Sequence, residues 1–225
     1  MSSMRVLRTN VNFHEEEPNN RRFPSHRPLF YYITDSRSLP VPNETALLSC
    51  IRKVISRGVD FIQIREKDLP DRRLLELTRQ VVEMARDAQC RVLVNGRADI
   101  AAAAGADGVH LASTGLGISD IRSWIPKNFI VGASVHTLSE IRAACVGEAD
   151  YILVGHVFPT ASKEGMGAAL GVDFLRRACV EASAPVLALG GITVERIAAV
   201  LQAGTAGVAG ISLFQQDDEF VFTEM

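Results

Sequence analysis

The stretch from Arg91 to Gly115, RVLVNGRADIAAAAGADGVHLASTG, contains two short apolar runs separated by an alanine-rich segment. The runs Arg91–Val94 and Gly108–Leu111 are almost continuously apolar, which is typical of parallel strands that helices cover. The segment between them is predicted to be a helix. Each run ends at polar, loop-forming residues, and ligands bind at the carboxyl ends of parallel strands in α/β proteins. The stretch therefore predicts a parallel α/β fold with a site near Asn95 and Ser113.

The same alternation continues along the rest of the chain. The predicted strands are Leu29–Ile33, Phe61–Ile64, Arg91–Val94, Gly108–Leu111, Ile130–Ala133, Tyr151–Val154, Val186–Leu189 and Gly207–Ile211. Segments with helical spacing between them include Thr45–Ser56, Arg72–Ala88, Ser139–Val146, Val172–Glu181 and Val194–Ala203. Eight strands separated by helices in about 185 residues predict a (β/α)8 TIM barrel. The alternative is an open doubly wound sheet, which is less favoured because no GxGxxG follows the first strand.

Both ends of the chain depart from a regular barrel. Residues 1–27 are polar and carry no sustained period, so we expect an N-terminal extension outside a barrel domain at 28–225. Residues 214–225 are too few for a normal helix after the eighth strand, and the eighth helix is expected to be shortened or missing. The extension could cover the groove that is left, and so could a second subunit in a homodimer.

Composition narrows the range of functions. The formal net charge of -2 gives no footprint for nucleic acid or for an anionic membrane, so neither is expected as a partner. No apolar run is long enough to span a bilayer, and the N-terminus lacks the apolar region of a signal peptide. The four cysteines are far apart and form no CxxC pair, which favours reduced thiols over disulfides or a metal site. We expect a cytoplasmic protein.

Polar side chains follow several predicted strands. After the second strand, alternation places Gln63, Arg65 and Lys67 on one side, so that an amide and two cations face the barrel mouth. After the fifth strand comes His136, a candidate general acid or base because histidine titrates near neutral pH. The alternatives are a solvated charged loop for the cations and a structural role for the histidine.

The loops after the last three strands have features of anion-binding loops. The loop after the sixth strand carries Thr160, Ser162 and Lys163 and many small residues, which favours a mobile lid. Gly190-Gly191 and Gly210–Ser212 follow the seventh and eighth strands, where such barrels expose backbone N–H groups to phosphate. A tight turn without a ligand is the alternative for the paired glycines.

Seven segments of the chain, in order and at matching spacing, resemble the thiamine phosphate synthase superfamily from about Tyr31 to Phe214. They are QIREK, VNGRADIA, GADGVHL, GASVHT, DYILVGHVFPTASK, APVLALGGIT and AGVAGIS. The resemblance implies one of two activities. A thiamine phosphate synthase joins a pyrimidine pyrophosphate to a thiazole phosphate with the help of Mg²⁺, and a thiazole tautomerase of the TenI type isomerises a carboxythiazole phosphate without metal.

Three motifs favour the tautomerase branch. Synthases carry Asn-Asp-Arg after the third strand and Gly-Gln-Glu-Asp after the fourth, and the two Asp residues hold the metal. Gly96 and Gly115 stand at those positions here, so no magnesium site is evident. The sequences Asn-Gly-Arg at 95–97, Ser-Val-His at 134–136 and Gly-His-Val-Phe at 155–158 instead match the tautomerase.

The resemblance therefore implies an isomerase of thiamine biosynthesis that converts a carboxythiazole(ylidene) ethyl phosphate into its aromatic tautomer. His136 would be the acid/base, and the amides of Gly190, Gly191, Gly210 and Ile211, with the hydroxyl of Ser212, would hold the phosphate. The other expected substrate contacts are Arg65, Lys67, Asn95, Ser134, Thr160, Ser162 and Lys163. No cofactor is expected, and Mg²⁺ only in a synthase. Two alternatives stay open: a thiamine phosphate synthase with other metal ligands, and a non-catalytic regulator that binds the thiazole phosphate.

Overall fold

The computed structural model describes residues 23, 27–160 and 167–216 of the 225-residue chain. The strands are β1 (Leu29–Ile33), β2 (Phe61–Ile64), β3 (Arg91–Asn95), β4 (Gly108–Leu111), β5 (Ile130–Val135), β6 (Tyr151–Gly155), β7 (Val186–Leu189) and β8 (Gly207–Gly210). The α-helices are α1 (Glu44–Ser56), α2 (Asp71–Ala85), α3 (Ala98–Ala104), α4 (Ile118–Arg122), α5 (Leu138–Val146), α6 (Gly171–Glu181), α7 (Val194–Gln202) and α8 (Ser212–Gln216), with a short 3₁₀ turn η2 (Ser36–Ser38).

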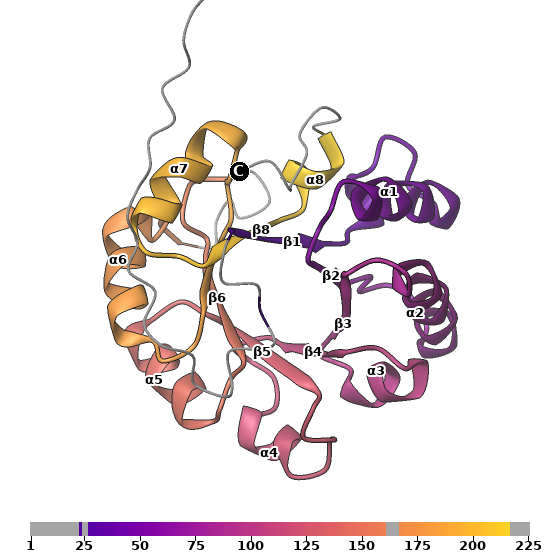
Figure 1. The fold of residues 1–225 in the computed structure, drawn as a ribbon, viewed down its shortest axis with the longest axis horizontal. Coiled ribbons are helices and arrows are strands. Elements are labelled where there is room, and N and C mark those ends of the chain that lie inside the picture. The colour runs from indigo at the N-terminus through magenta and orange to yellow at the C-terminus, as the bar shows by residue number, and fades with distance from the viewer. Residues whose placement is uncertain (1–22, 24–26, 161–166, 217–225) are drawn as a thin grey trace, which may run out of the picture.

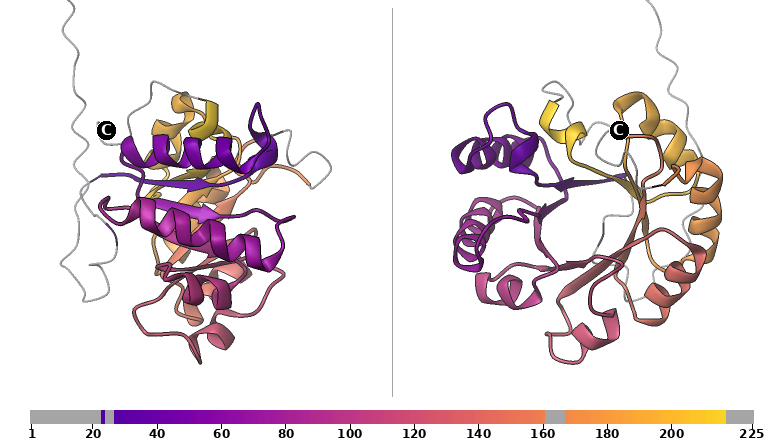
Figure 2. Two further views of the ribbon diagram at one scale, coloured as in Figure 1. Left: turned by 90° about the vertical axis from the view of Figure 1, so that its right-hand side faces the viewer. Right: turned by 180° about the vertical axis from the view of Figure 1, so that it is seen from behind.

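The eight strands form one closed parallel barrel in sequence order, and β1 pairs with β8 to close it. Helices form an outer ring around the strands (Figure 1, Figure 2). The predicted TIM barrel is confirmed. Because all strands run in the same direction, the residues that follow each strand meet at one end, which we call the mouth. No described helix is both long and apolar enough to cross a membrane.

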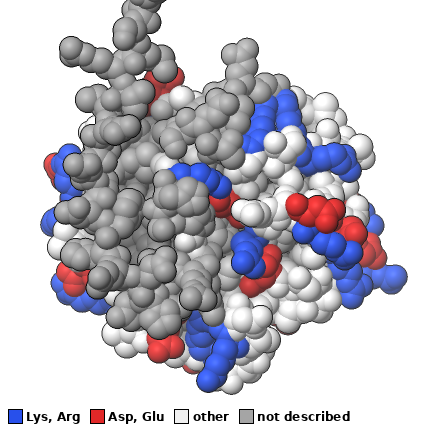
Figure 3. Space-filling model, in the orientation of Figure 1, with Lys and Arg blue, Asp and Glu red and all other residues white. Residues whose placement is uncertain are grey.

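The helices form because their apolar residues recur on one face. In α1, Leu47, Ile51 and Val54 are buried against the strands, and the Asn43 side chain accepts a hydrogen bond from the Ala46 amide at the helix start. On the outer faces of α1 and α2, charges of both signs alternate, as on the right-hand side of Figure 3. Arg73, for example, pairs there with Glu44 and Glu76.

The core has an outer and an inner layer, because successive residues of each strand point to opposite faces. The outer layer lies between strands and helices and includes Tyr32. The inner layer fills the barrel and includes Tyr31, Phe61 and Tyr151. Gly132 makes room for the Tyr151 ring, since a Cβ at this position would lie 1.9 Å from Cζ of that tyrosine.

The end of the barrel is short, as predicted. In the described residues α8 has five residues. Its Phe214 ring packs against Tyr32 with centroids 5.6 Å apart, and the Gln215 amide donates to the Tyr32 hydroxyl at 3.0 Å. These two side chains cover the outer surface of β1. A regular eighth helix would cover this surface with a longer segment.

Two described residues of the predicted extension contact the barrel. Phe23 is buried at the end opposite the mouth, where its ring lies 5.4 Å from that of Phe61 and 6.3 Å from that of Tyr151. Arg27 forms an ion pair with Asp60 at 2.6 Å. The domain boundary near residue 28 stays a prediction, but the chain before it contributes one ring to the inner core.

Candidate functional site

The mouth brings together most of the residues that the sequence singled out. Gln63 lies in β2, and Arg65 and Lys67 follow this strand. Asn95 is the last residue of β3. Ser134 lies near the end of β5, and His136 is the first residue after it. Thr160 lies after β6, and the glycine turns lie after β7 and β8. Ser162 and Lys163 lie outside the described residues. The individual roles that were assigned to these residues stay predictions.

A pocket of about 290 Å³ lies at the rim over β2 and β3. Its polar lining comes from the cations Arg65, Lys67 and Arg97, the amide of Asn95, and the carboxylates Glu66 and Asp71. The three cationic side chains and the amide outnumber the two carboxylates, and they are suited to an anion with several oxygens, such as a phosphate or a pyrophosphate.

Arg97 is held by two carboxylates. Its guanidinium binds both oxygens of Asp99, at 2.9 and 2.6 Å, and also contacts Asp71. The hydrogen bonds from Arg97 lower the pKa of Asp99, so this carboxylate stays ionised. The pairing fixes the position of Arg97 at the rim and engages Asp71, one of the two carboxylates that line the pocket.

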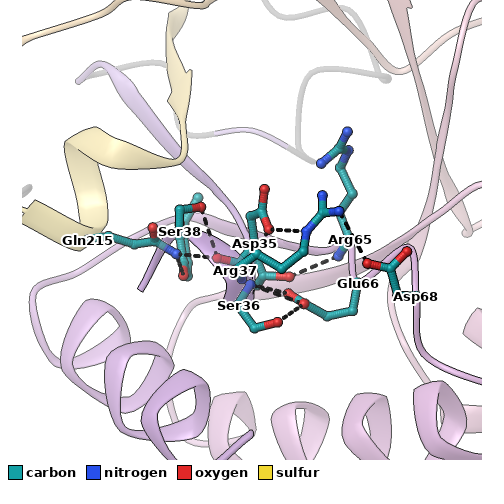
Figure 4. A network of polar contacts seen from close by, with 10 residues as sticks. Asp35, Ser36, Arg37, Ser38, Arg65, Glu66, Asp68 and Gln215 are labelled. Carbon is teal, nitrogen blue, oxygen red and sulfur yellow. Dashed lines mark hydrogen bonds and ion pairs between the residues drawn. The ribbon is translucent and has the colours of Figure 1, made fainter. Parts of the chain in front are cut away.

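Glu66 anchors the neighbouring loop, so that the residues on either side of it face outward. It is buried and accepts hydrogen bonds from the Ser36 amide and hydroxyl, the latter at 2.6 Å. The Arg65 amide donates to the Thr34 hydroxyl at 2.9 Å. Figure 4 shows the Arg65 side chain extending away from the Glu66 contacts. The loop therefore presents the guanidinium of Arg65 without burying it.

His136 is exposed, and both its backbone and its ring are held. Its amide donates to Glu140 at 2.5 Å, in the capping box that begins α5 with Thr137. Its ring Nδ1 lies within hydrogen-bonding distance of the Gly155 carbonyl oxygen, which can only accept. Nδ1 therefore carries a proton, and in the neutral ring Nε2 is the nitrogen with the lone pair.

The two glycine turns lie on neighbouring strands. Gly190 and Gly191 both have positive φ, 96° and 65°, and follow β7, which pairs with β8. The Arg196 side chain binds the Gly191 carbonyl at 2.6 Å and stacks over the Phe158 ring at 4.6 Å. Gly210, Ile211 and Ser212 lead into α8. The positions expected to bind phosphate are therefore adjacent at the mouth.

A chain of hydrogen bonds inside the barrel was not foreseen from the sequence. Its central member is His110 on β4, whose ring contacts the Tyr151 hydroxyl at 2.9 Å and the Ser134 hydroxyl at 2.8 Å. His110 is fully buried, and burial together with the charge of Arg65 lowers its pKa to about 3. The ring is therefore neutral at physiological pH. The signal that could have revealed it is a single polar residue within an apolar strand run.

The described residues of the site do not fit Mg²⁺. Position 96 has no side chain beyond hydrogen, Gly115 adds none, and Asp71 and Asp99 are engaged by Arg97. Among the residues that the structure describes, no group of three His, Cys, Asp or Glu side chains could hold a metal ion. A divalent cation needs several oxygen ligands, which the described rim does not supply.

Comparison with known proteins places this site in a family. Residues 30–214 match the sequence family described as Thiamine monophosphate synthase. The chain belongs to the thiamine phosphate synthase superfamily.

Individual relatives of this superfamily agree with the match. The chain is 41% identical to the thiamine-phosphate synthase of Methanoculleus marisnigri, over 72% of this chain and 76% of that protein. It is 36% identical to the thiamine-phosphate synthase of Roseiflexus castenholzii, over 84% and 82%. The solved structure of thiamine phosphate pyrophosphorylase from Pyrococcus furiosus superposes with a TM-score of 0.75 at 32% identity, covering 84% of this chain and 89% of that one.

These relatives correct the predicted activity. The expected thiazole tautomerase, an isomerase, is contradicted, because the similar proteins are named for a synthase, which is a transferase. The prediction was wrong because it weighted three short motifs and two missing carboxylates above the similarity of the whole chain. The catalytic role of His136 stays a prediction.

Proposed function

We propose that the protein is a thiamine-phosphate synthase, which joins hydroxymethylpyrimidine pyrophosphate to thiazole phosphate and releases pyrophosphate. The observation that carries the proposal is the similarity of most of the chain to proteins named thiamine-phosphate synthase, at 36 to 41% identity. Of the activities expected from the sequence, the synthase, which was an alternative there, therefore replaces the tautomerase.

The cationic side chains that line the 290 Å³ pocket support this reaction. When the bond between the pyrimidine methylene carbon and the pyrophosphate oxygen breaks, negative charge grows on the departing pyrophosphate. Arg65 and Lys67 line the 290 Å³ pocket with Asn95 and can hold these oxygens. Fixed cations at a site of developing charge stabilise the transition state without reorganisation. The glycine turns after β7 and β8 would hold the phosphate of the thiazole, which attacks through its ring nitrogen.

The proposal differs from a metal-assisted transfer in one respect. Because the described rim offers no carboxylate cluster, no step is assigned to Mg²⁺ here, and charge neutralisation is assigned to the cationic side chains. This absence in the described residues also favours a second candidate function, a barrel that binds the two phosphorylated compounds without joining them.

One assay separates the two candidates. The purified protein is incubated with both substrates, with and without MgCl₂, and the formation of thiamine phosphate and pyrophosphate is followed. We expect coupling under at least one of these conditions. Calorimetric binding of both compounds with no product in either would overturn the synthase and establish the binding-only function.

A matched variant tests the missing carboxylates. Gly96 has φ of +68°, a conformation that Asp tolerates better than most residues, and an added Cβ meets no described atom within 4 Å. At position 115 an added Cβ would lie 3.3 Å from the Ala112 carbonyl oxygen, so that this loop must shift by a few tenths of an ångström. We expect the double variant Gly96→Asp/Gly115→Asp to fold and its coupling rate to rise with MgCl₂ more steeply than that of the wild type. Identical magnesium dependence in both proteins would contradict the assignment of the two positions.

A further inference from the structure

The hydrogen bonds inside the barrel form one continuous chain between two sides of the mouth. It runs from Asn95 through Gln63, Tyr31, Tyr151 and His110 to Ser134. The two end residues are partly exposed, whereas the four in between are at most 2% exposed. Each buried member therefore has to satisfy its hydrogen bonds within the chain.

The donor and the acceptor of each hydrogen bond can be assigned by starting from Asn95. The Gln63 amide nitrogen donates to Asn95 Oδ1 at 2.8 Å, which leaves Gln63 Oε1 as an acceptor for Tyr31. The Tyr31 hydroxyl has a single proton and gives it to Gln63 at 3.2 Å. In its contact with the Tyr151 hydroxyl, at 2.7 Å, Tyr31 can then only accept.

The Tyr151 hydroxyl determines the tautomer of His110. Tyr151 gives its proton to Tyr31, so it accepts from His110 Nδ1 at 2.9 Å, and that nitrogen carries the proton. Burial raises the pKa of both tyrosines, which keeps their hydroxyls protonated. The neutral His110 has a lone pair on Nε2, and the Ser134 hydroxyl must donate to it at 2.8 Å.

We propose that His110 is a positioning residue that holds Ser134 as a hydrogen-bond acceptor at the mouth, so that this side of the site takes a ligand group bearing an N–H or O–H. The proton of Ser134 is used inward, and only its lone pairs are left for a ligand. At the other end, Asn95 Oδ1 is used inward and its Nδ2 is left to donate, beside the cations of the anion pocket. The buried chain thus gives the two sides of the mouth opposite polarity.

The substrate part of this inference rests on the proposed function, but the tautomer does not. It is measured in the free protein by ¹⁵N NMR of ring-labelled histidine, with the His110 signals assigned by their loss in His110→Asn. We expect the Nδ1–H tautomer. An Nε2–H tautomer would overturn the inference, whatever the enzymatic activity.

Two adjacent tyrosines provide a variant and its control. Tyr31→Phe removes the acceptor of the Tyr151 proton, so that Tyr151 should donate to His110 Nδ1 and the ring should change to Nε2–H. Tyr32→Phe removes a hydroxyl of the outer layer, which contacts Gln215 and Cys50 and not the chain. We expect the tautomer to change in Tyr31→Phe only. If it changes in neither variant, the proposed series of directed hydrogen bonds is wrong.

Kinetics supply a second readout that a purely structural role would not give. In Tyr31→Phe, we expect KM for one substrate to rise about 10-fold with kcat nearly unchanged, as for the loss of one well-directed hydrogen bond to the bound ligand. A fall in kcat with unchanged KM would overturn the assignment of Ser134 to binding. If the wild type has the Nδ1–H tautomer but forms no product, the chain stands and the proposed function fails.

Discussion

The two ends of the barrel differ in how their charges are used. At the end opposite the mouth, Asp60, Asp107 and Asp150 each stand one residue before an even-numbered strand. Each accepts a hydrogen bond from a backbone amide of the preceding strand, at 2.7 to 2.8 Å, and each pairs with an arginine. The end opposite the mouth thus repeats one structural device around the ring.

At the mouth, cationic side chains gather around one pocket instead. Arg65 and Lys67 line it together, with Asn95 between β2 and β4. Charge at one end therefore holds the strands together, whereas cationic side chains at the other end line the candidate site. In TIM barrels generally, stability and function divide between the two ends in this way.

The largest effect is expected at the end opposite the mouth, from Asp150→Ala. The Asp150 side chain is 5% exposed and binds both the Val131 amide, at 2.7 Å, and Arg122. Its removal leaves a buried amide without its acceptor and a largely buried guanidinium without its counter-charge, and we expect a loss of about 3–5 kcal/mol in the free energy of unfolding. Urea denaturation measures it. The control is Asp173→Ala, whose side chain is 94% exposed and should change stability little. A loss below about 1 kcal/mol for Asp150→Ala would refute the structural role.

The next largest effect is expected at the mouth, from Arg65→Ala. If this guanidinium stabilises the departing pyrophosphate, kcat/KM for coupling should fall about 10²–10³-fold while the melting temperature stays close to that of the wild type. The matched control is Arg86→Ala, an arginine at the opposite end that pairs with Glu83. Equal losses of activity in the two variants would remove the distinction between the ends.

A smaller effect concerns pH and the inside of the barrel. The pKa of His110 in the folded protein, about 3, lies below the ordinary value of 6.5, so the unfolded chain binds one more proton between these values. Stability should therefore fall as pH decreases through this window, by about 1.4 kcal/mol per pH unit from this group. Denaturation at several pH values should give a smaller slope for His110→Asn than for the wild type. An unchanged slope in His110→Asn would contradict it.

The smallest effect is expected from Asp107→Ala. This residue makes the same contacts as Asp150, but its side chain is 31% exposed and Arg91 is half exposed. Water can replace the lost partner, and we expect a loss of about 1 kcal/mol. Urea titrations of both variants should show a larger loss in the free energy of unfolding for Asp150→Ala than for Asp107→Ala. This order would show that burial, rather than the pattern of contacts, determines the loss. The reverse order would contradict it.

Much of the fold could be predicted because it depends on local pattern. The eight apolar runs became strands at nearly the predicted bounds, since parallel strands covered by helices are apolar on both faces. The short helix α4 was not predicted, because five residues carry too little periodicity. The aspartates before β2, β4 and β6 are visible in the sequence as a repeat, yet their arginine partners lie up to 33 residues away.

The site could be predicted only as a set of positions. Strand-end residues such as Asn95, Arg65 and His136 were placed at the mouth by topology alone. The Arg97 pairing with Asp71 and the chain through His110 depend on side-chain geometry across several strands, which no local pattern encodes. The activity was misjudged for a related reason, because short motifs around two glycines do not report on the similarity of the whole barrel.

Phe23 has a practical consequence for anyone who shortens this protein. A fragment that starts at residue 28 would keep all eight strands and every predicted site residue, but it would expose Phe61 and Tyr151 at the lower opening of the barrel. Tyr151 also belongs to the hydrogen-bonded chain that ends at Ser134. Trimming residues 1–27 would therefore admit water beneath Tyr151, so the shortest fragment with a closed inner core is longer than the eight-stranded barrel itself.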